Sequence, residues 1–400
     1  MRIIERKDLL NQLLSYRNTP DIKIITGVRR SGKSELVKEF LNHISTHETN
    51  PLNIVYIDLT DLDFEELTEY HSLHSYIKES YHEDAQNILC IDEIQMCPEF
   101  EKAINSIHSK GLWDIYLTGS NAFLLSSDLA TLFTGRYIDI HVLPFSFNEY
   151  RSYFGQNDID KQFDEYVQTG GMSGAYSYLN QNSRRAYISN IYNTILNKDL
   201  TLKRKVTNEA AFNALSEYLM DNVGNLTTIN NVSNILKSEG LSSSHITVGN
   251  YIQYLCESFL FYKVKRYDIK GKRYLKSSDK YYLVDPGFRW AILGTRNLDY
   301  GHMYENIVAI ELIRRGWDIY VGKLHEKEID FVAMRGSEKV YIQVSDDISN
   351  QDTLNREVTP LLHIKDAYPK ILIARTKHET YSHLGIKVVD IARWLANSEL

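Results

Sequence analysis

The chain has 400 residues, of which 43% are hydrophobic and 24% charged, a composition typical of globular proteins. Its length is sufficient for two or three domains, each with its own core. No apolar stretch approaches the roughly 18 residues that a membrane span needs, and the N-terminal segment lacks the apolar centre of a signal peptide, so we expect a cytoplasmic protein. The three cysteines show no C-x-x-C spacing, so we expect neither zinc nor a disulfide.

The first apolar run, Ile22 to Ile25, leads into a predicted phosphate-binding loop. Residues 27 to 34 match G-x-x-x-x-G-K-[ST] without a mismatch, and a helical pattern begins at Ser34. Backbone N–H groups of such a loop surround a di- or triphosphate, and the helix dipole adds positive potential. Lys33 would reach the β- and γ-phosphates, and Ser34 would hold Mg²⁺. The alternative is a glycine turn that carries a lysine by chance. The residues assigned to the nucleotide are Gly27, Val28, Arg29, Arg30, Ser31, Gly32, Lys33 and Ser34.

A second apolar run, Ile88 to Ile91, predicts a buried parallel strand that ends in two acids. Asp92 and Glu93 follow it directly, about 60 residues after the phosphate-binding loop, as in a Walker B strand. Asp92 would bind Mg²⁺ through water, while Glu93 would orient and activate the water that attacks the γ-phosphate.

A third apolar run, Trp113 to Leu117, is followed by T-G-S-N. A polar side chain at this place would lie between the first and third strands and contact the γ-phosphate or the attacking water. Ser120 and Asn121 are the candidates for this role.

The next segment ends in the pair Gly135-Arg136 before another predicted strand, Tyr137 to Val142. With the preceding motifs, this order resembles an AAA+ ATPase. In that family an arginine at this place is offered to the γ-phosphate of the neighbouring subunit, and Arg136 is the matching position. The alternative is an ordinary surface arginine.

Residues 145 to 205 read as helical, with Gly170-Gly171 interrupting the pattern, and occupy the place of an AAA+ lid. A lid usually supplies a second arginine to the nucleotide within a G-x-R motif. No clear G-x-R is present, so Arg184 and Arg185 are the available substitutes.

Three helical patterns and two alternating strands between residues 206 and 290 predict a winged helix-turn-helix. The net charge of the chain is −7, yet Lys263 to Lys280 holds eight bases against two acids, so this segment is the expected contact for a polyanion. Such a module places its third helix in a DNA major groove and its wing beside phosphates. The alternative is a domain that only packs against its neighbours. The residues assigned to DNA are His245 and Asn250 on the third helix and Lys270, Lys272 and Arg273 on the wing.

The last hundred residues show the element order of the PD-(D/E)xK nuclease fold. Glu305, Asp330 and Gln343 occupy the metal-binding positions, but the catalytic lysine position is Ser345. Serine cannot supply the positive charge that activates the attacking water. Two displaced bases, Lys339 and Arg356, could stand in, although the spacing does not require it. We expect a nuclease-like fold without cleavage activity. The alternative is an α/β scaffold that binds no metal.

These segments predict an α/β protein with a P-loop AAA+ core at 1–144, a helical lid at 145–205, a winged helix at 206–290 and a restriction-endonuclease-like domain at 291–400. This order resembles prokaryotic AAA+ ATPases whose C-terminal half is a domain of unknown function. The resemblance implies an ATPase that uses ATP and Mg²⁺ and works as a homo-oligomer, such as a hexamer.

Two functions remain open. In the first, the oligomer binds duplex or branched DNA without sequence preference and remodels it or moves along it. In the second, the protein is a nucleotide-dependent switch that holds a protein partner in signalling or defence.

Overall fold

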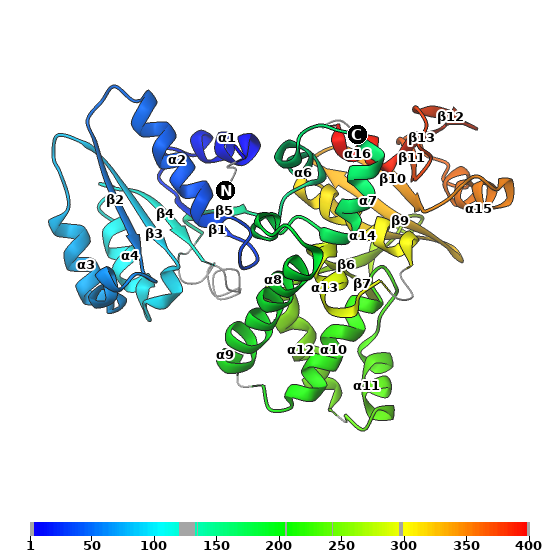
Figure 1. Ribbon diagram of the computed structural model, residues 1–400, viewed down its shortest axis with the longest axis horizontal. Helices are drawn as coiled ribbons and strands as arrows, with labels where there is room; N and C mark the ends of the chain where they lie inside the picture. The colour runs from blue at the N-terminus through cyan, green and yellow to red at the C-terminus, as the bar shows by residue number, and fades with distance from the viewer. Residues whose placement is uncertain are drawn as a thin grey trace. The chain divides into compact units, whose positions relative to one another are not determined.

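The computed structural model describes residues 4–119, 133, 135–204, 206–241, 243–295 and 299–397. The chain forms two compact units (Figure 1). The N-terminal unit comprises Arg2–Leu143 with Glu257–Phe259, and the C-terminal unit comprises Pro144–Cys256 with Leu260–Leu400. Within the described residues, every helix falls short of the length or the apolar character needed to cross a membrane.

The N-terminal unit is built on a five-stranded parallel sheet with the strand order β2-β3-β4-β1-β5. Its strands are β1 Ile22–Thr26, β2 Leu52–Asp58, β3 Gln86–Asp92, β4 Asp114–Thr118 and β5 Tyr137–His141. Its helices are α1 Lys7–Ser15, α2 Lys33–His47, η1 Leu62–Thr68, α3 Tyr70–Glu79, η2 Ile94–Met96 and α4 Phe100–His108.

Both faces of this sheet are covered, which explains why its central strands read as continuous apolar runs. On one face, Ile25 and Cys90 pack with apolar residues of α1 and α2. On the other face, Ile24 and Ile91 pack with η1, α3 and α4. Alternate residues of each strand therefore serve two separate cores.

The C-terminal unit begins with helices in the segment expected to form a lid. These elements are α6 Phe147–Phe154, α7 Ile159–Thr169, η4 Ser173–Ser177, α8 Gln181–Thr194, the π-helical η5 Ile195–Thr201 and α9 Leu202–Arg204. Two contacts attach α7 to later parts of the same unit: Phe163 packs against Tyr304, with ring centroids 5.4 Å apart, and Arg375 Nη1 lies 2.6 Å from Asp160 Oδ1. The helices of residues 145–205 thus share a core with the C-terminal α/β elements.

Three helices follow, and then two strands. They are α10 Glu209–Asp221, α11 Ile229–Ser238, α12 His245–Glu257, β6 Phe261–Asp268 and β7 Arg273–Leu283. The two strands pair with each other in antiparallel fashion, as expected of a wing. However, β6 also pairs in parallel with the later strand β8, from Arg266↔Val321 to Asp268↔Lys323. The hairpin is therefore the edge of a larger sheet, and the boundary expected at residue 290 does not separate two compact units.

That larger sheet has eight strands in the order β12-β13-β11-β10-β9-β8-β6-β7. Its remaining strands are β8 Asp318–Leu324, β9 Lys327–Arg335, β10 Glu338–Ser345, β11 Lys370–Ala374, β12 Tyr381–His383 and β13 Ile386–Asp390. The remaining helices are α13 Pro286–Leu293, α14 Tyr300–Arg314, α15 Gln351–Leu362 and α16 Ile391–Ala396. Every residue of α14 from Met303 to Leu312 is buried, so this helix lies inside the unit.

A buried aspartate joins the first helices of the C-terminal unit to α13. The Asp285 carboxylate accepts hydrogen bonds from Gly171 N at 2.5 Å and from Gly287 N at 2.9 Å. Burial raises the pKa of Asp285 to about 7, although both hydrogen bonds act to lower it. A Cβ at Gly170 would lie 1.9 Å from Asp285 Oδ1, and a Cβ at Gly171 would lie 2.0 Å from the carbonyl oxygen of Phe145, so close approaches require both glycines that interrupt the helical pattern.

Candidate functional site

The loop between β1 and α2 has a backbone that requires glycine at both ends. Gly27 has φ +141°, and a Cβ there would lie 2.1 Å from the carbonyl oxygen of Val142. Gly32 has φ +98° and directly precedes α2. Because the loop ends at the first turn of a 15-residue helix, its N–H groups and the helix dipole together favour an anion.

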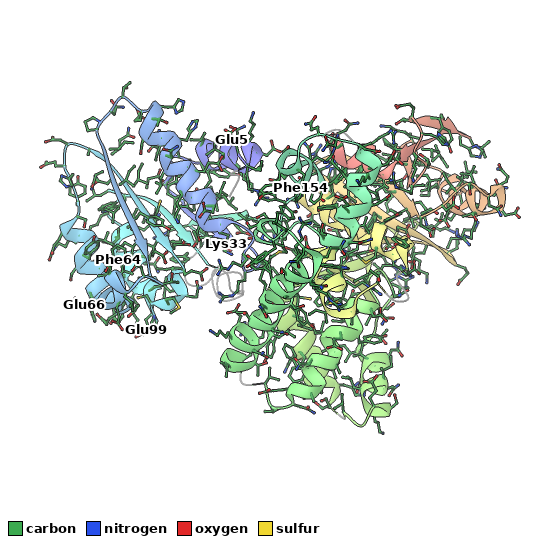
Figure 2. The ribbon with its side chains drawn as sticks, viewed as in Figure 1. Glu5, Lys33, Phe64, Glu66, Glu99 and Phe154 are labelled. Carbon is green, nitrogen blue, oxygen red and sulfur yellow. The ribbon has the colours of Figure 1, made fainter. Side chains whose placement is uncertain are left out.

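Lys33 is the first residue of α2, where Figure 2 labels it, and only 5% of its surface is exposed. Its ammonium donates to the carbonyl oxygens of Gly27 at 3.0 Å and Val28 at 3.1 Å. The charge is thus held over the loop, at the place where phosphate oxygens would compete for it. Ser34 follows on the helix and is half-buried.

Arg6 supports the same loop, although it belongs to no recognisable sequence motif. Its guanidinium donates to the carbonyl oxygens of Ser31 at 3.1 Å and Leu143 at 3.0 Å, and the side chain is buried. It therefore connects the loop to the segment after β5. The Ser31 hydroxyl is buried and has no hydrogen-bond partner within the described part of the chain, so this oxygen is available to a ligand in the loop.

Asp92 lies at the end of β3 and is held from both neighbouring strands. The Thr118 hydroxyl at the end of β4 donates to Asp92 Oδ1, and the Tyr56 hydroxyl from β2 donates to Asp92 Oδ2 at 3.2 Å. Thr118 Oγ1 also accepts from the backbone N–H of Glu93 at 3.1 Å. Sequence reasoning missed Thr118, which lies just before the two expected polar residues.

Glu93 adopts a left-handed backbone with φ +54°, an uncommon conformation for a non-glycine residue. The Gln95 amide nitrogen donates to Glu93 Oε2. Because a carboxylate can only accept, this contact also fixes the direction of the amide, and Gln95 Oε1 is left buried without a hydrogen-bond partner in the described residues. Gln95 thus orients the carboxylate that was assigned to water activation.

Strand order brings the two halves of this site to the same edge. β4 lies between β1 and β3, and all three strands run parallel, so the phosphate-binding loop, Thr118 and the Asp92-Glu93 pair share the carboxyl edge of the sheet. Ser120 and Asn121, which were expected to contact the γ-phosphate or the water, lie outside the described residues.

Arg136 lies at the opposite edge of the sheet. It directly precedes β5, and its carbonyl oxygen accepts from Ile22 N at 3.0 Å, where β1 begins. Five residues of strand, or about 16 Å, separate this edge from the phosphate-binding loop. The side chain is exposed, and it cannot complete the site of its own chain.

The residues assigned to DNA all lie on the surface of the C-terminal unit. His245 and Asn250 are exposed on α12. Lys270, Lys272 and Arg273 are exposed at the β6–β7 turn. Because β6 pairs with β8, this turn lies beside the β8–β9 turn, where Lys270 Nζ is 3.5 Å from His325 Nε2. Lys280, counted in the same basic run of the sequence, is instead buried.

The structure brings the residues of the expected nuclease-like site together around Lys280. Its ammonium lies 2.8 Å from Glu305 Oε1, 2.8 Å from Glu328 Oε1 and 3.9 Å from Asp330 Oδ1. The Gln343 side-chain oxygen lies 3.4 Å from Asp330 N. Neither expected substitute is in this cluster: Lys339 contacts Tyr341 and Asp366, while Arg356 contacts Glu357.

The charged groups in this cluster strongly shift one another's pKa values. Burial alone would lower the pKa of Lys280, but the three carboxylates outweigh it and raise that pKa above its usual value. Burial and the charge of Glu305 raise the pKa of Asp330. Among the described residues, no group of three or more histidine, cysteine or acidic side chains is arranged to hold a metal ion. The Lys280 ammonium lies within 4 Å of all three of these carboxylates.

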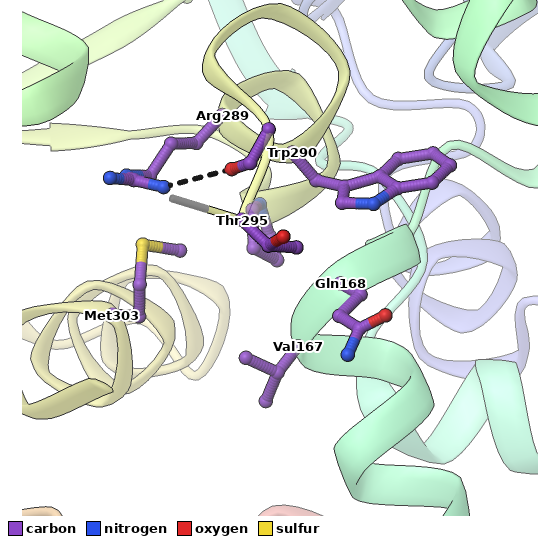
Figure 3. A pocket seen from close by; sticks show the side chains of 8 residues that line it. Val167, Gln168, Arg289, Trp290, Thr295 and Met303 are labelled. Atoms are coloured by element: carbon purple, nitrogen blue, oxygen red, sulfur yellow. Dashed lines mark hydrogen bonds between the residues drawn. The ribbon is translucent and has the colours of Figure 1, made fainter. Parts of the chain in front are cut away.

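A small hollow near α7, α13 and α14 offers no comparable chemistry (Figure 3). It is lined mostly by apolar or neutral side chains, among them Val167, Trp290 and Met303. Its charged side chain, Arg289, already donates to Gly294 O at 3.1 Å and to Asp221 Oδ1 at 2.9 Å.

Two family models match the chain. One is described as an AAA domain and matches residues 19–151. The other is a domain of unknown function, DUF8612, and matches residues 160–299. The first range covers the sheet of the N-terminal unit and its phosphate-binding loop, and the second ends between α13 and α14.

Among solved structures, the similarities are distant. Orc1 of Aeropyrum pernix in complex with DNA has a TM-score of 0.33 and 9% identity, with 78% of this chain and 94% of that chain covered. AMPPCP-bound DnaA of Aquifex aeolicus has a TM-score of 0.31 and 15% identity, with 64% and 90% covered. Scores this low have no bearing on function.

Two relatives match over nearly the whole chain. An uncharacterized protein of Methanocaldococcus jannaschii is 24% identical over 408 residues, which cover 98% of this chain and 89% of that protein. An uncharacterized protein of Haemophilus influenzae is 36% identical over 398 residues, which cover 98% of each. The chain thus contains an AAA domain and belongs to the same family as the Haemophilus influenzae protein.

Proposed function

We propose that the protein is a Mg²⁺-dependent ATPase of the AAA+ class. The observation that carries this proposal is the meeting of Lys33, Asp92 and Glu93 at one edge of the sheet. The loop amides from Gly27 to Ser34 and the Lys33 ammonium would bind the phosphates of ATP. Ser34 and Asp92 would hold Mg²⁺, which neutralises charge on the phosphate oxygens. The glycine backbone, the unpartnered Ser31 hydroxyl and the buried Asp92 carboxylate fit these ligands.

Glu93 would accept a proton from the attacking water, and Gln95 would hold it in position. A flexible glutamate loses side-chain freedom when it is used as a base, so a donor that restrains it in advance lowers that cost. The Gln95 amide oxygen, which has no hydrogen-bond partner among the described residues, could accept from a second donor at the site.

We further propose that the ATPase acts as a homo-oligomer in which Arg136 completes the site of a neighbour. The support is its position: the side chain is exposed at the edge of the sheet opposite its own loop. An arginine there can stabilise charge on transferring phosphate only in another subunit.

We propose DNA as the substrate on which this ATPase works, by remodelling or translocation. The support is the exposed basic turn, which lies beside the exposed His325 of the β8–β9 turn and the half-buried Lys323 and Lys327 at the adjoining strand ends. Lysine and arginine on two neighbouring turns suit a phosphate backbone and provide no means of choosing a sequence. His245 and Asn250 on α12 would face the same ligand.

Substitutions at the proposed nucleotide site test the proposal that the protein hydrolyses ATP. Lys33→Ala should weaken ATP binding because phosphate charge is left uncompensated. Glu93→Gln should keep binding and lose turnover by about 10²–10⁴-fold, since the base is gone while the metal ligands remain. The matched control is Glu99→Gln, an exposed glutamate with a similar backbone, φ +59°, which should leave turnover unchanged. Turnover within about tenfold of wild type in Glu93→Gln would remove that role.

Gln95→Met, which keeps the side-chain length and removes the donor, should lower kcat roughly tenfold with little change in KM for ATP. The control is Gln86→Met at the other end of β3, where the glutamine accepts from Arg17 Nη2 at 2.7 Å. That variant should change the melting temperature and leave kcat alone. Steady-state kinetics distinguish the two, and an unaltered kcat in Gln95→Met contradicts the positioning role.

Arg136→Ala should reduce turnover by at least about 10³-fold at unchanged ATP affinity, because its effect is on the transition state. Mixing it with Lys33→Ala subunits should restore part of the activity, since interfaces with two intact half-sites then form. Lys110→Ala, an exposed base before β4 at the same edge, is the control. A fully active monomer would refute subunit completion.

Replacing Lys270, Lys272 and Arg273 with glutamate should weaken DNA binding for unrelated sequences and reduce the salt dependence by up to about three counterions. The control changes Lys237, Lys365 and Lys377, exposed bases elsewhere in the same unit, and so alters the net charge equally. Equal effects in both variants would show a nonspecific charge effect. ATPase activity without DNA binding or DNA stimulation would favour the alternative, a switch that holds a protein partner.

A further inference from the structure

The eight-stranded sheet contains a buried lysine that is shared by three carboxylates from two different elements. Lys280 lies on β7, Glu305 on α14, and Glu328 and Asp330 on β9. The ammonium is 2.8 Å from Glu305 and from Glu328 and 3.9 Å from Asp330. Lys280 and Glu305 are 3% and 5% exposed, so water cannot solvate their charges and each needs a partner within the protein.

The oxygens that a metal ion would need are already engaged. Glu305 Oε1 accepts from both the Lys280 ammonium and the Tyr282 hydroxyl, the latter at 2.6 Å. His302 Nδ1 lies 3.6 Å from Glu305 Oε2. Asp330 Oδ2 accepts from Val344 N at 2.8 Å. A hydrated divalent ion needs about six oxygen ligands, several of them water, and these hydrogen bonds compete for the protein ligands.

The loop between α10 and α11 closes the cluster from outside. Gly224 has φ +74°, and a Cβ there would lie 3.0 Å from both Glu305 Oε2 and His302 Nδ1. Gly224 N donates to Tyr281 O at 3.3 Å, and Thr227 pairs with Asp279 on β7. Backbone therefore occupies the space beside Glu305, where a phosphodiester would have to enter.

We propose that the Lys280 ammonium takes the place of the divalent metal ion in this nuclease-like site. The cluster then joins β7, β9 and α14 permanently, and the C-terminal unit binds no metal there and cleaves no DNA. The three carboxylate oxygens already surround one point at 2.8–3.9 Å. Metal–oxygen distances are about 2.0–2.6 Å, so a modest inward shift would create a cation site once the lysine is withdrawn. This inference is independent of ATP hydrolysis.

The test uses the full-length, nucleotide-free protein and titrates Mn²⁺ by calorimetry while following the melting temperature. Wild type and Asp330→Asn should bind equal amounts of Mn²⁺, because wild type has no site that depends on Asp330. Lys280→Met should melt roughly 5–10 °C lower, as expected when one partner of a buried ion pair is removed. It should also gain one Mn²⁺ site that raises its melting temperature, and the added change Asp330→Asn should abolish that gain.

The matched control is Lys339→Met, a lysine of β10 near Asp366 outside the cluster, which should gain no Mn²⁺ site. If Lys280→Met does not fold, Lys280→Met with Glu328→Gln relieves the repulsion and keeps Glu305 and Asp330 as ligands. The proposal is overturned if wild type has a Mn²⁺ site that Asp330→Asn removes, or if a folded Lys280→Met variant gains none. Cleavage of linear or branched DNA by wild type that disappears in Asp330→Ala also overturns it. None of these outcomes depends on whether Glu93→Gln loses turnover.

Discussion

In a parallel sheet the strand order decides which loops meet, and here β4 lies between β1 and β3. Because the three strands run in the same direction, the loop proposed to bind phosphate and the acids at the end of β3 lie at one edge of the sheet. Thr118, from the strand between them, donates to Asp92 and accepts from Glu93 N, so one hydroxyl aligns both acids. The chemistry proposed for the N-terminal unit depends on this single arrangement.

Each unit contains a buried lysine whose charge is paired with carboxylates inside the protein. Lys23, the second residue of β1, is fully buried and lies 2.6 Å from Asp114 Oδ1 on the neighbouring strand. Lys280 lies instead on β7, the edge strand of the larger sheet, and is shared by three carboxylates. In both cases the partner carboxylates belong to elements that are separated from the lysine in the sequence. A buried charge without such a partner would be strongly unfavourable.

The C-terminal unit shows why domain boundaries are difficult to infer from local patterns. The helices of α10 to α12 and the β6–β7 hairpin have the order of a winged helix, but β6 continues the sheet through β8. The hairpin therefore has two roles: its turn is exposed and basic, while Lys280 and Tyr282 of β7 reach into the cluster around Glu305. The two roles lie at opposite ends of the hairpin, because the residues at its turn are exposed whereas Lys280 to Leu283 are all buried.

The local motifs could be recognised from the sequence alone: the glycines and Lys33 of the phosphate-binding loop, the strand that ends in Asp92-Glu93, and the positions of Glu305 and Asp330. These depend on short-range backbone requirements, which residue type and spacing express directly. Arg6, Thr118, Gln95 and Lys280 could not be predicted, because each acts through a contact that only folding creates or through an orientation that spacing does not express. Lys280 shows this most clearly, since its sequence neighbourhood is that of an exposed base. Its burial depends on contacts made only in the folded chain, where its ammonium lies 2.8 Å from Glu305 on α14 and 2.8 Å from Glu328 on β9.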